Sequence, residues 1–214
     1  MQHHSARGLR NCKLGSMLGA FGKQEIDVTA GAVDLLSCAI YVRQTLQIAT
    51  APGPGIPPPE VLRTLSQPSQ MAEEWIEWWH TLAHSVAMNA GNGIEVQAGQ
   101  VVATLDRWSG LRSETMSIVD DALAWAAEER TRLGQAQRNS GIAARAARAA
   151  GERPRILRRN TKTSLRIAYL PAIGAWFCAI PPSLVLIGEG SLRDHDESRK
   201  AVEAGVGQLT RRHG

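Results

Sequence analysis

An uncharged run at residues 167–188 constrains this chain more than any other feature. A transmembrane helix needs roughly 20 consecutive apolar residues, because each residue adds about 1.5 Å and the hydrocarbon core is about 30 Å thick. The run is long enough to meet this requirement. We therefore expect residues 167–188 to form a single transmembrane helix, with Trp176 inside it as a contact to lipid or to a partner protein.

Prolines within the run leave other interpretations open. Pro171 lies near its start, and Pro181 and Pro182 would remove helix hydrogen bonds in its second half. In a second interpretation, the prolines break the run into two buried strands, residues 166–170 and 183–188. The apolar pattern alone does not distinguish short buried strands from a buried helix. A segment that lies at the membrane surface or re-enters it is the third interpretation.

Basic side chains crowd the segment before the run. Between residues 138 and 166 there are nine, opposed only by Glu152, although the whole chain has a formal charge of just +4. The positive-inside rule would hold this side of a span in the cytoplasm or matrix, where it could meet anionic lipid headgroups. Nucleic acid is a less favoured partner, because no aromatic residue interleaves with the arginines, and a solvated helix is the plainer alternative. The predicted contact residues are Arg153, Arg155, Arg158, Arg159, Lys162 and Arg166.

Three segments have the spacing of amphipathic helices. Apolar residues recur at steps of three and four through residues 30–49, 69–89 and 113–150, and the Pro- and Gly-rich segment 51–59 ends the first of them. Shorter helices are predicted within 91–105, where a hairpin is the alternative, and at 192–208. Trp75, Trp78 and Trp79 share one face of the second helix, and we expect them to contact partner helices or the membrane surface.

Four polar residues share the opposite face of that helix: Glu73, Glu77, His80 and His84. The Glu-x-x-His step from Glu77 to His80 resembles half of the site in di-iron carboxylate bundles. The sequence lacks a second such motif, so a metal would need ligands from another chain. A solvated face with local ion pairs is the simpler interpretation, and metal binding is left open.

Two short motifs resemble parts of known families. Trp108-Ser109-Gly110 resembles the turn of the small WXG-type helical hairpins exported by type VII secretion, a likeness that covers at most residues 25–140. The segment 184–193, an apolar run followed by Gly-Glu-Gly-Ser-Leu-Arg, resembles the strand, glycine loop and helix with which nucleotide-sugar glycosyltransferases hold a phosphate. That resemblance implies an enzyme with Arg193 at a nucleotide.

The cysteines and the N-terminal residues add compartment hints. Cys12, Cys38 and Cys178 have no paired spacing, so we expect reduced thiols and neither a disulfide framework nor a zinc site. The first 24 residues carry basic side chains and no acid, which is typical of a mitochondrial presequence or a basic arm, with an unstructured leader as the alternative.

Taken together, the sequence predicts a mainly α-helical protein, a helical bundle or hairpins with a single C-terminal transmembrane helix. The expected organisation is a basic leader or arm (1–24), a helical region (25–150) with its linker at 51–59, a basic juxtamembrane segment (151–166), the transmembrane helix (167–188) and a C-terminal helix and tail (189–214).

The function that follows is a non-catalytic accessory or assembly subunit of a membrane protein complex, without a cofactor. Its location would be the mitochondrial inner membrane of a eukaryote or the cytoplasmic membrane of a bacterium, and its partners other subunits and anionic lipid. The alternative is a soluble helical binding module, either like the type VII hairpins or associated with RNA.

Overall fold

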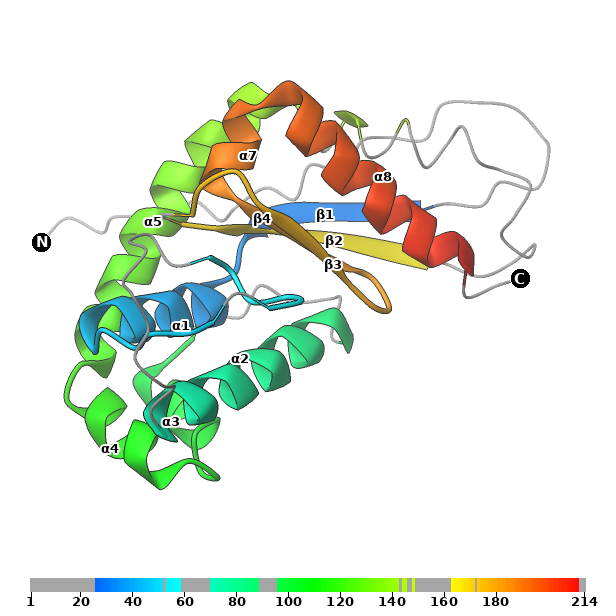
Figure 1. Ribbon diagram of the computed structural model, residues 1–214. Coiled ribbons are helices and arrows are strands. Elements are labelled where there is room, and N and C mark those ends of the chain that lie inside the picture. Colours follow the sequence, from blue (N-terminus) through cyan, green and yellow to red (C-terminus); the bar gives the residue numbers. More distant parts are fainter. Residues whose placement is uncertain are drawn as a thin grey trace, which may run out of the picture.

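The centre of the molecule is a four-stranded mixed sheet with the strand order β1-β2-β4-β3 (Figure 1). The computed structural model describes residues 26–51, 53–58, 70–88, 96–142, 144, 145, 148, 163–171 and 173–211. The strands are β1 (Ile26–Ala32), β2 (Thr163–Leu170), β3 (Phe177–Ile180) and β4 (Leu184–Gly188). Strands β1, β2 and β4 run parallel, and β3 pairs antiparallel with β4.

Helices cover both faces of this sheet. They are α1 (Asp34–Thr45), α2 (Gln70–Met88), α3 (Ala98–Ala103), α4 (Ser109–Met116), α5 (Val119–Ser140), α7 (Glu189–Arg193) and α8 (His195–Arg211). Figure 1 shows α8 on one side of the sheet and α1 and α2 on the other. Helix α5 stands beside the end of the sheet and extends from the layer of α1 to that of α7.

Alternation along β2 and β4 supplies both halves of the core. Ala168, Leu170 and Leu186 face the cluster formed with α1 and α2, whereas Ile167 and Val185 face the cluster formed with α8. Successive side chains of a strand point to opposite faces, so a strand covered on both sides must be apolar at every position. All five residues of β4 are buried.

This double burial explains the uncharged run and corrects our prediction of a transmembrane helix. Residues 167–188 contain the end of β2, the β3–β4 hairpin and all of β4. Within the described part of the chain, no helix combines the length and the apolarity needed to cross a bilayer. The alternative of two buried strands broken by the prolines is confirmed for 166–170 and 183–188, with β3 added between them.

The fold class, the membrane assignment and the location are corrected with it. A mixed sheet between two helical layers replaces the predicted helical bundle. The single-pass placement, whether in a mitochondrial inner membrane or in a bacterial cytoplasmic membrane, rested on the span and is not supported. The basic segment before residue 167 likewise precedes a sheet strand rather than a span.

Several helices lie where the sequence predicted them. The helix at 69–89 is α2, the short helix in 91–105 is α3, and the last helix is divided into α7 and α8. The helix expected at 30–49 begins only at Asp34, because residues 26–32 form β1. Strand β1 pairs in parallel with β2, which lies more than a hundred residues later in the sequence. The residues around β1 therefore carry no local signal of this pairing.

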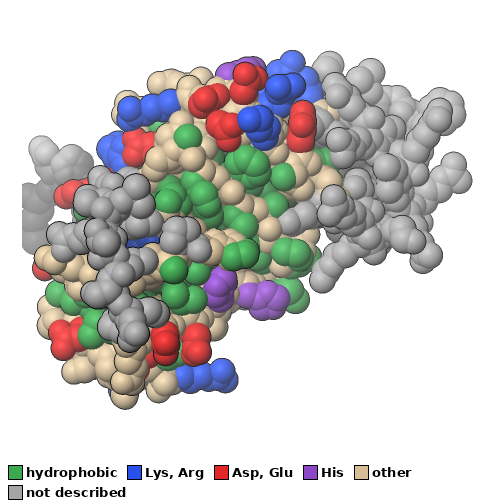
Figure 2. Space-filling view, viewed as in Figure 1, with side chains coloured by type: hydrophobic (Ala, Val, Ile, Leu, Met, Phe, Trp, Pro, Cys, Tyr) green, Lys and Arg blue, Asp and Glu red, His purple; other side chains and the backbone are tan. Residues whose placement is uncertain are grey.

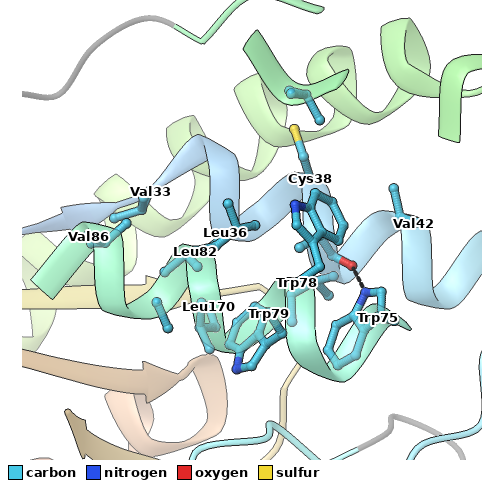
Figure 3. Close-up of a cluster of buried hydrophobic side chains, with 14 of the residues drawn as sticks. Val33, Leu36, Cys38, Val42, Trp75, Trp78, Trp79, Leu82, Val86 and Leu170 are labelled. Atoms are coloured by element: carbon cyan, nitrogen blue, oxygen red, sulfur yellow. Dashed lines mark hydrogen bonds between the residues drawn. The ribbon is translucent and has the colours of Figure 1, made fainter. Parts of the chain in front are cut away.

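The three tryptophans of α2 form the core between α2 and its neighbours. Trp75, Trp78 and Trp79 are fully buried, and Figure 3 shows Trp78 and the indole nitrogen of Trp75 directed toward α1. Each indole N–H donates to a different segment: Trp75 to the carbonyl of Ala39 (2.9 Å), Trp78 to the hydroxyl of Thr104 (2.8 Å), and Trp79 to the carbonyl of Gly55 (2.8 Å). Buried N–H groups need such partners, so the indoles both fill the core and orient the chain around it.

Arg43 of α1 holds the proline-rich segment against this core. Its guanidinium donates to the carbonyls of Pro57 (2.7 Å) and Pro58 (3.2 Å) and lies 4.9 Å from the ring centre of Trp75. Burial lowers the pKa of Arg43 to about 10. Since a buried cation is stable only when its donors are satisfied, the carbonyls of this segment are part of the fold.

Two glycines of α8 provide a matched test of how closely this helix packs on the sheet. A Cβ at Gly205 would lie 2.3 Å from Cγ2 of Val185, whereas a Cβ at Gly207 would meet nothing within 4 Å. Overpacking costs about 1–3 kcal/mol, and replacing a helical glycine by alanine gains up to about 1 kcal/mol. We expect Gly205→Ala to lower the free energy of unfolding in urea and Gly207→Ala to raise it. Equal effects of the two changes would contradict this packing.

Candidate functional site

The carboxyl ends of the parallel strands are the first place to look for a functional site. Open parallel sheets bind ligands in the crevice outside these ends. Here the ends of β1, β2 and β4 lie together, and an acidic residue follows two of them: Asp34 after β1 and Glu189 directly after β4. Glu189 is buried, and only 12% of each acidic side chain is exposed.

Arginines of α5 pair with both acids. Nη1 of Arg130 lies 2.5 Å from Oδ2 of Asp34, and the guanidinium of Arg132 donates to both oxygens of Glu189, at 2.5 and 2.7 Å. Residues two apart on a helix point to nearly opposite sides, which is why neighbouring arginines reach the layer of α1 and the layer of α7. Arg193 also donates to Glu189 (2.7 Å). Here α5 joins the ends of β1 and β4 by charge.

The charges in this edge network are balanced. Arg130, Arg132 and Arg193 meet Asp34 and Glu189, and Glu129, which accepts from the guanidinium of Arg132, is the third acid. The hydrogen bond from Arg132 holds the pKa of Glu189 below its usual range, and the bonds to Glu189 and Glu129 raise the pKa of Arg132. Glu189 and Arg132 are therefore both charged at neutral pH, and each of the six groups has a partner of opposite charge in the network.

The space next to the two glycines that flank Glu189 is filled by another segment of the chain. A Cβ at Gly188 would lie 2.6 Å from the carbonyl oxygen of Gly174, and one at Gly190 would lie 2.5 Å from the backbone nitrogen of Ala175. The amide of Gly188 donates to the carbonyl of Trp176 (2.8 Å), and that of Gly190 to Ile173 (3.0 Å). These glycines allow residues 173–176 to pass over the β4–α7 junction, in the space where the glycosyltransferase resemblance would place a phosphate.

Five of the ten predicted contact residues lie in the described part of the chain, and the other five do not. Trp75, Trp78 and Trp79 face the interior of this chain, so their indoles offer no surface to a bilayer or partner. Trp176 is half-buried against the α2 side of the core, and its carbonyl accepts from Gly188 and Ser191. Arg166 is half-buried on β2, where burial lowers its pKa. Arg153, Arg155, Arg158, Arg159 and Lys162 lie outside the described residues.

The polar face of α2 is an exposed surface with one internal contact. Glu73, Glu77, His80 and His84 are all exposed, and Oε2 of Glu77 accepts from the indole N–H of Trp108 (3.0 Å). Among the described residues, His, Cys, Asp and Glu form no group of three that could hold a metal ion. The exposure of these side chains agrees with the solvated face that the sequence offered as the simpler interpretation, whereas the local ion pairs expected there are not found among the described salt bridges.

The Trp-Ser-Gly motif lies at the start of α4. Trp108 is the residue before the helix, and Gly110 lies close to the carboxylate of Glu74, which accepts from the amide of Leu111 (2.8 Å). The helices on either side, α3 and α4, have six and eight residues. The motif therefore joins α4 to α2, in a setting unlike the two long helices that the resemblance implies.

Sequence reasoning missed the edge network entirely. One signal was present: Glu189 directly follows an apolar strand-like run, which is where an acid at the carboxyl edge of a sheet would stand. Asp34, Arg130 and Arg132 carry no comparable signal, because their meeting depends on how α5 lies against the sheet.

The chain matches no protein-family model, no curated protein and no solved structure.

The depressed pKa of Glu189 predicts how the network responds to acid. A carboxyl whose folded pKa is lower than its unfolded value, about 4.3, stabilises the fold above that value and loses this contribution as pH falls through the folded pKa. We expect Glu189→Gln to destabilise the protein most at neutral pH, with the difference from the natural chain shrinking below about pH 4. Urea unfolding between pH 7 and pH 3 measures it. Glu203→Gln, at an exposed position of α8, is the control, and a pH-independent difference would contradict the prediction.

Proposed function

We propose that this chain is a non-catalytic binding module that contributes protein contacts to an assembly. The observation that carries the proposal is the edge network, which occupies the carboxyl ends of the parallel strands with the chain's own ion pairs. A small-molecule site at this edge would need some polar groups turned toward a ligand. Here the carboxylates of Asp34 and Glu189 are turned toward arginines of α5 instead.

The described cysteines support the same proposal. Burial, with the carboxylate of Asp34 nearby, raises the pKa of Cys38 to about 12, and its sulfur lies 3.6 Å from the carbonyl oxygen of Ala122. Burial also raises the pKa of Cys178. Both thiols are therefore protonated at neutral pH, whereas a nucleophile or a metal ligand must be a thiolate.

The surface along β3 is suited to protein contact. Figure 2 shows apolar side chains gathered between α8 and α2, where Figure 1 places β3, with charged groups above and below them. The four residues of β3 are half-buried, and Met88 at the end of α2 is 57% exposed. The side-chain hydroxyl of Ser183 donates to the carbonyl of Ala87 (2.9 Å), which holds Met88 close to the β3–β4 turn.

Contacts through the basic segment remain predictions. Arg153, Arg155, Arg158, Arg159 and Lys162 were assigned to anionic lipid, with nucleic acid less favoured, and they lie outside the described residues. One neighbour is already engaged, because Nη2 of Arg145 donates to the hydroxyl of Ser198 in α8 (2.8 Å).

The hydrogen bonds already made by the amides of Gly188 and Gly190 predict that phosphate ligands do not bind at this glycine loop. We expect ATP and a nucleoside diphosphate sugar to leave the melting temperature of the full chain unchanged, because the loop amides already donate to residues 173 and 176. Differential scanning fluorimetry measures this. Arg193→Ala is the control variant, since that side chain is 76% exposed. A ligand-induced rise in melting temperature that Arg193→Ala abolishes would overturn the proposal in favour of an enzyme.

Site-specific photo-crosslinking tests the binding surface. We expect benzoylphenylalanine in place of Phe177 to form protein adducts in cells that express the chain, because this residue lies half-exposed in the uncharged surface along β3. The same probe in place of Glu128, at an exposed position of α5, is the control and should give none. Adducts at neither position, or equally at both, would argue against a binding module that uses this surface.

A further inference from the structure

The two edges of the sheet differ in how they are covered. Helix α5 packs against β1, where the side chain of Gln137 donates to the carbonyl of Ala30 (3.0 Å). Strand β3, at the other edge, pairs with β4 on one side, and no described strand pairs with its other side. Helices α8 and α2 contact β3 from the two faces of the sheet. The β3 edge therefore presents unpaired backbone between two helices.

The pairing with β4 determines which backbone groups face outward. The amide of Gly188 donates to the carbonyl of Trp176, and the register then matches Phe177 with Ile187 and Ala179 with Val185. In an antiparallel ladder, alternate residues direct both their N–H and their C=O toward the same neighbour. Since Trp176 faces β4, the backbone groups of Phe177 and Ala179 face away from it.

This edge has one of the usual protections against pairing, its short length of four residues. Natural edge strands are commonly shielded by charged side chains, prolines or bulges. Strand β3 has none of these, its sequence is Phe-Cys-Ala-Ile, and no charged residue occurs between residues 167 and 188. Pro181, directly after the strand, limits the open edge to about two outward-facing residues.

We infer that a second copy of this chain pairs with β3, edge to edge and antiparallel, about a two-fold axis at Cys178. Phe177 of one copy then lies opposite Ala179 of the other, and each pair exchanges two main-chain hydrogen bonds, about four in all. The two sheets join into one. This inference rests on the proposed binding function and names the partner.

The chemistry of the strand favours a second copy over an unrelated segment. Self-pairing places no like charges opposite one another, because the strand and its flanks are uncharged. The sizes also match, since the large side chain of Phe177 meets the small one of Ala179, both on the α8 side of the sheet. Cys178 meets its own equivalent on the α2 side, beside Gly55.

Removing one outward N–H tests the dimer without disturbing β4. Ala179→Pro deletes a donor that does not pair with β4, and proline is tolerated at outward positions of edge strands. The control is Ala98→Pro, at the first position of α3, where proline is also tolerated. By sedimentation equilibrium up to about 0.1 mM, a range suited to a small interface, we expect twice the monomer mass for the natural chain and for Ala98→Pro. Ala179→Pro should be monomeric with an unchanged circular dichroism spectrum.

Oxidative crosslinking tests the register. Residues opposite each other in a non-hydrogen-bonded antiparallel pair have Cα atoms about 4.5 Å apart, within the range of a disulfide. With diamide as the oxidant, at a pH alkaline enough to form the Cys178 thiolate, we expect a covalent dimer joined through Cys178, which peptide mapping identifies. Cys178→Ser and Ala179→Pro should both lose it.

The outcomes separate this inference from the function on which it rests. A natural chain that stays monomeric, or a dimer that persists in Ala179→Pro, overturns the pairing of two copies at β3. If the photo-crosslink at Phe177 then has the mass of a different protein, the binding module stands with another partner. If that adduct has twice the mass of the chain, it supports the second copy independently.

Discussion

Strand β4 is enclosed on all sides, and the rest of the structure depends on that enclosure. Its neighbours in the sheet are β2 and β3, and its alternating side chains enter the two apolar clusters. A strand in this position must be apolar throughout, and it needs a helical layer on each face. The tryptophans of α2 supply the bulk on one side. The close approach of α8, with Gly205 against Val185, supplies contact on the other.

Helix α5 adds the connection between these two layers. Its first half packs with α1 through Ala122 and Ala126, and Leu133 of its second half belongs to the cluster around α8. Arg130 and Arg132 pair with acids that follow different strands, which ties α5 to the carboxyl edge of the sheet. Both arginine side chains are more than a third exposed, so these ion pairs contribute little to the free energy of unfolding. Their main effect is to fix where α5 lies relative to the sheet.

The predictions that succeeded were those with a local cause. Helix α2 was predicted from the apolar residues Trp75, Trp78 and Leu82, which follow one another at steps of three and four residues, close to one helical turn. The polar face with His80 and His84 follows from the same period. Strand β1 and the edge network were missed. Their partners are remote: β1 pairs with residues 163–169, and Asp34 pairs with a side chain 96 positions away.

What the sequence determined by itself is the apolarity of residues 167–188, which favours burial, and the helical faces, since apolarity and periodicity are properties of a segment. Only the tertiary structure decided whether that burial was in lipid or in protein. Hydropathy is the same in both, and what distinguishes them is how the backbone is satisfied: β2 and β4 pair with each other and with neighbouring strands instead of forming one helix. The same non-local pairing decided which acids meet which arginines, and among the described strands it left the outer side of β3 without a strand beside it.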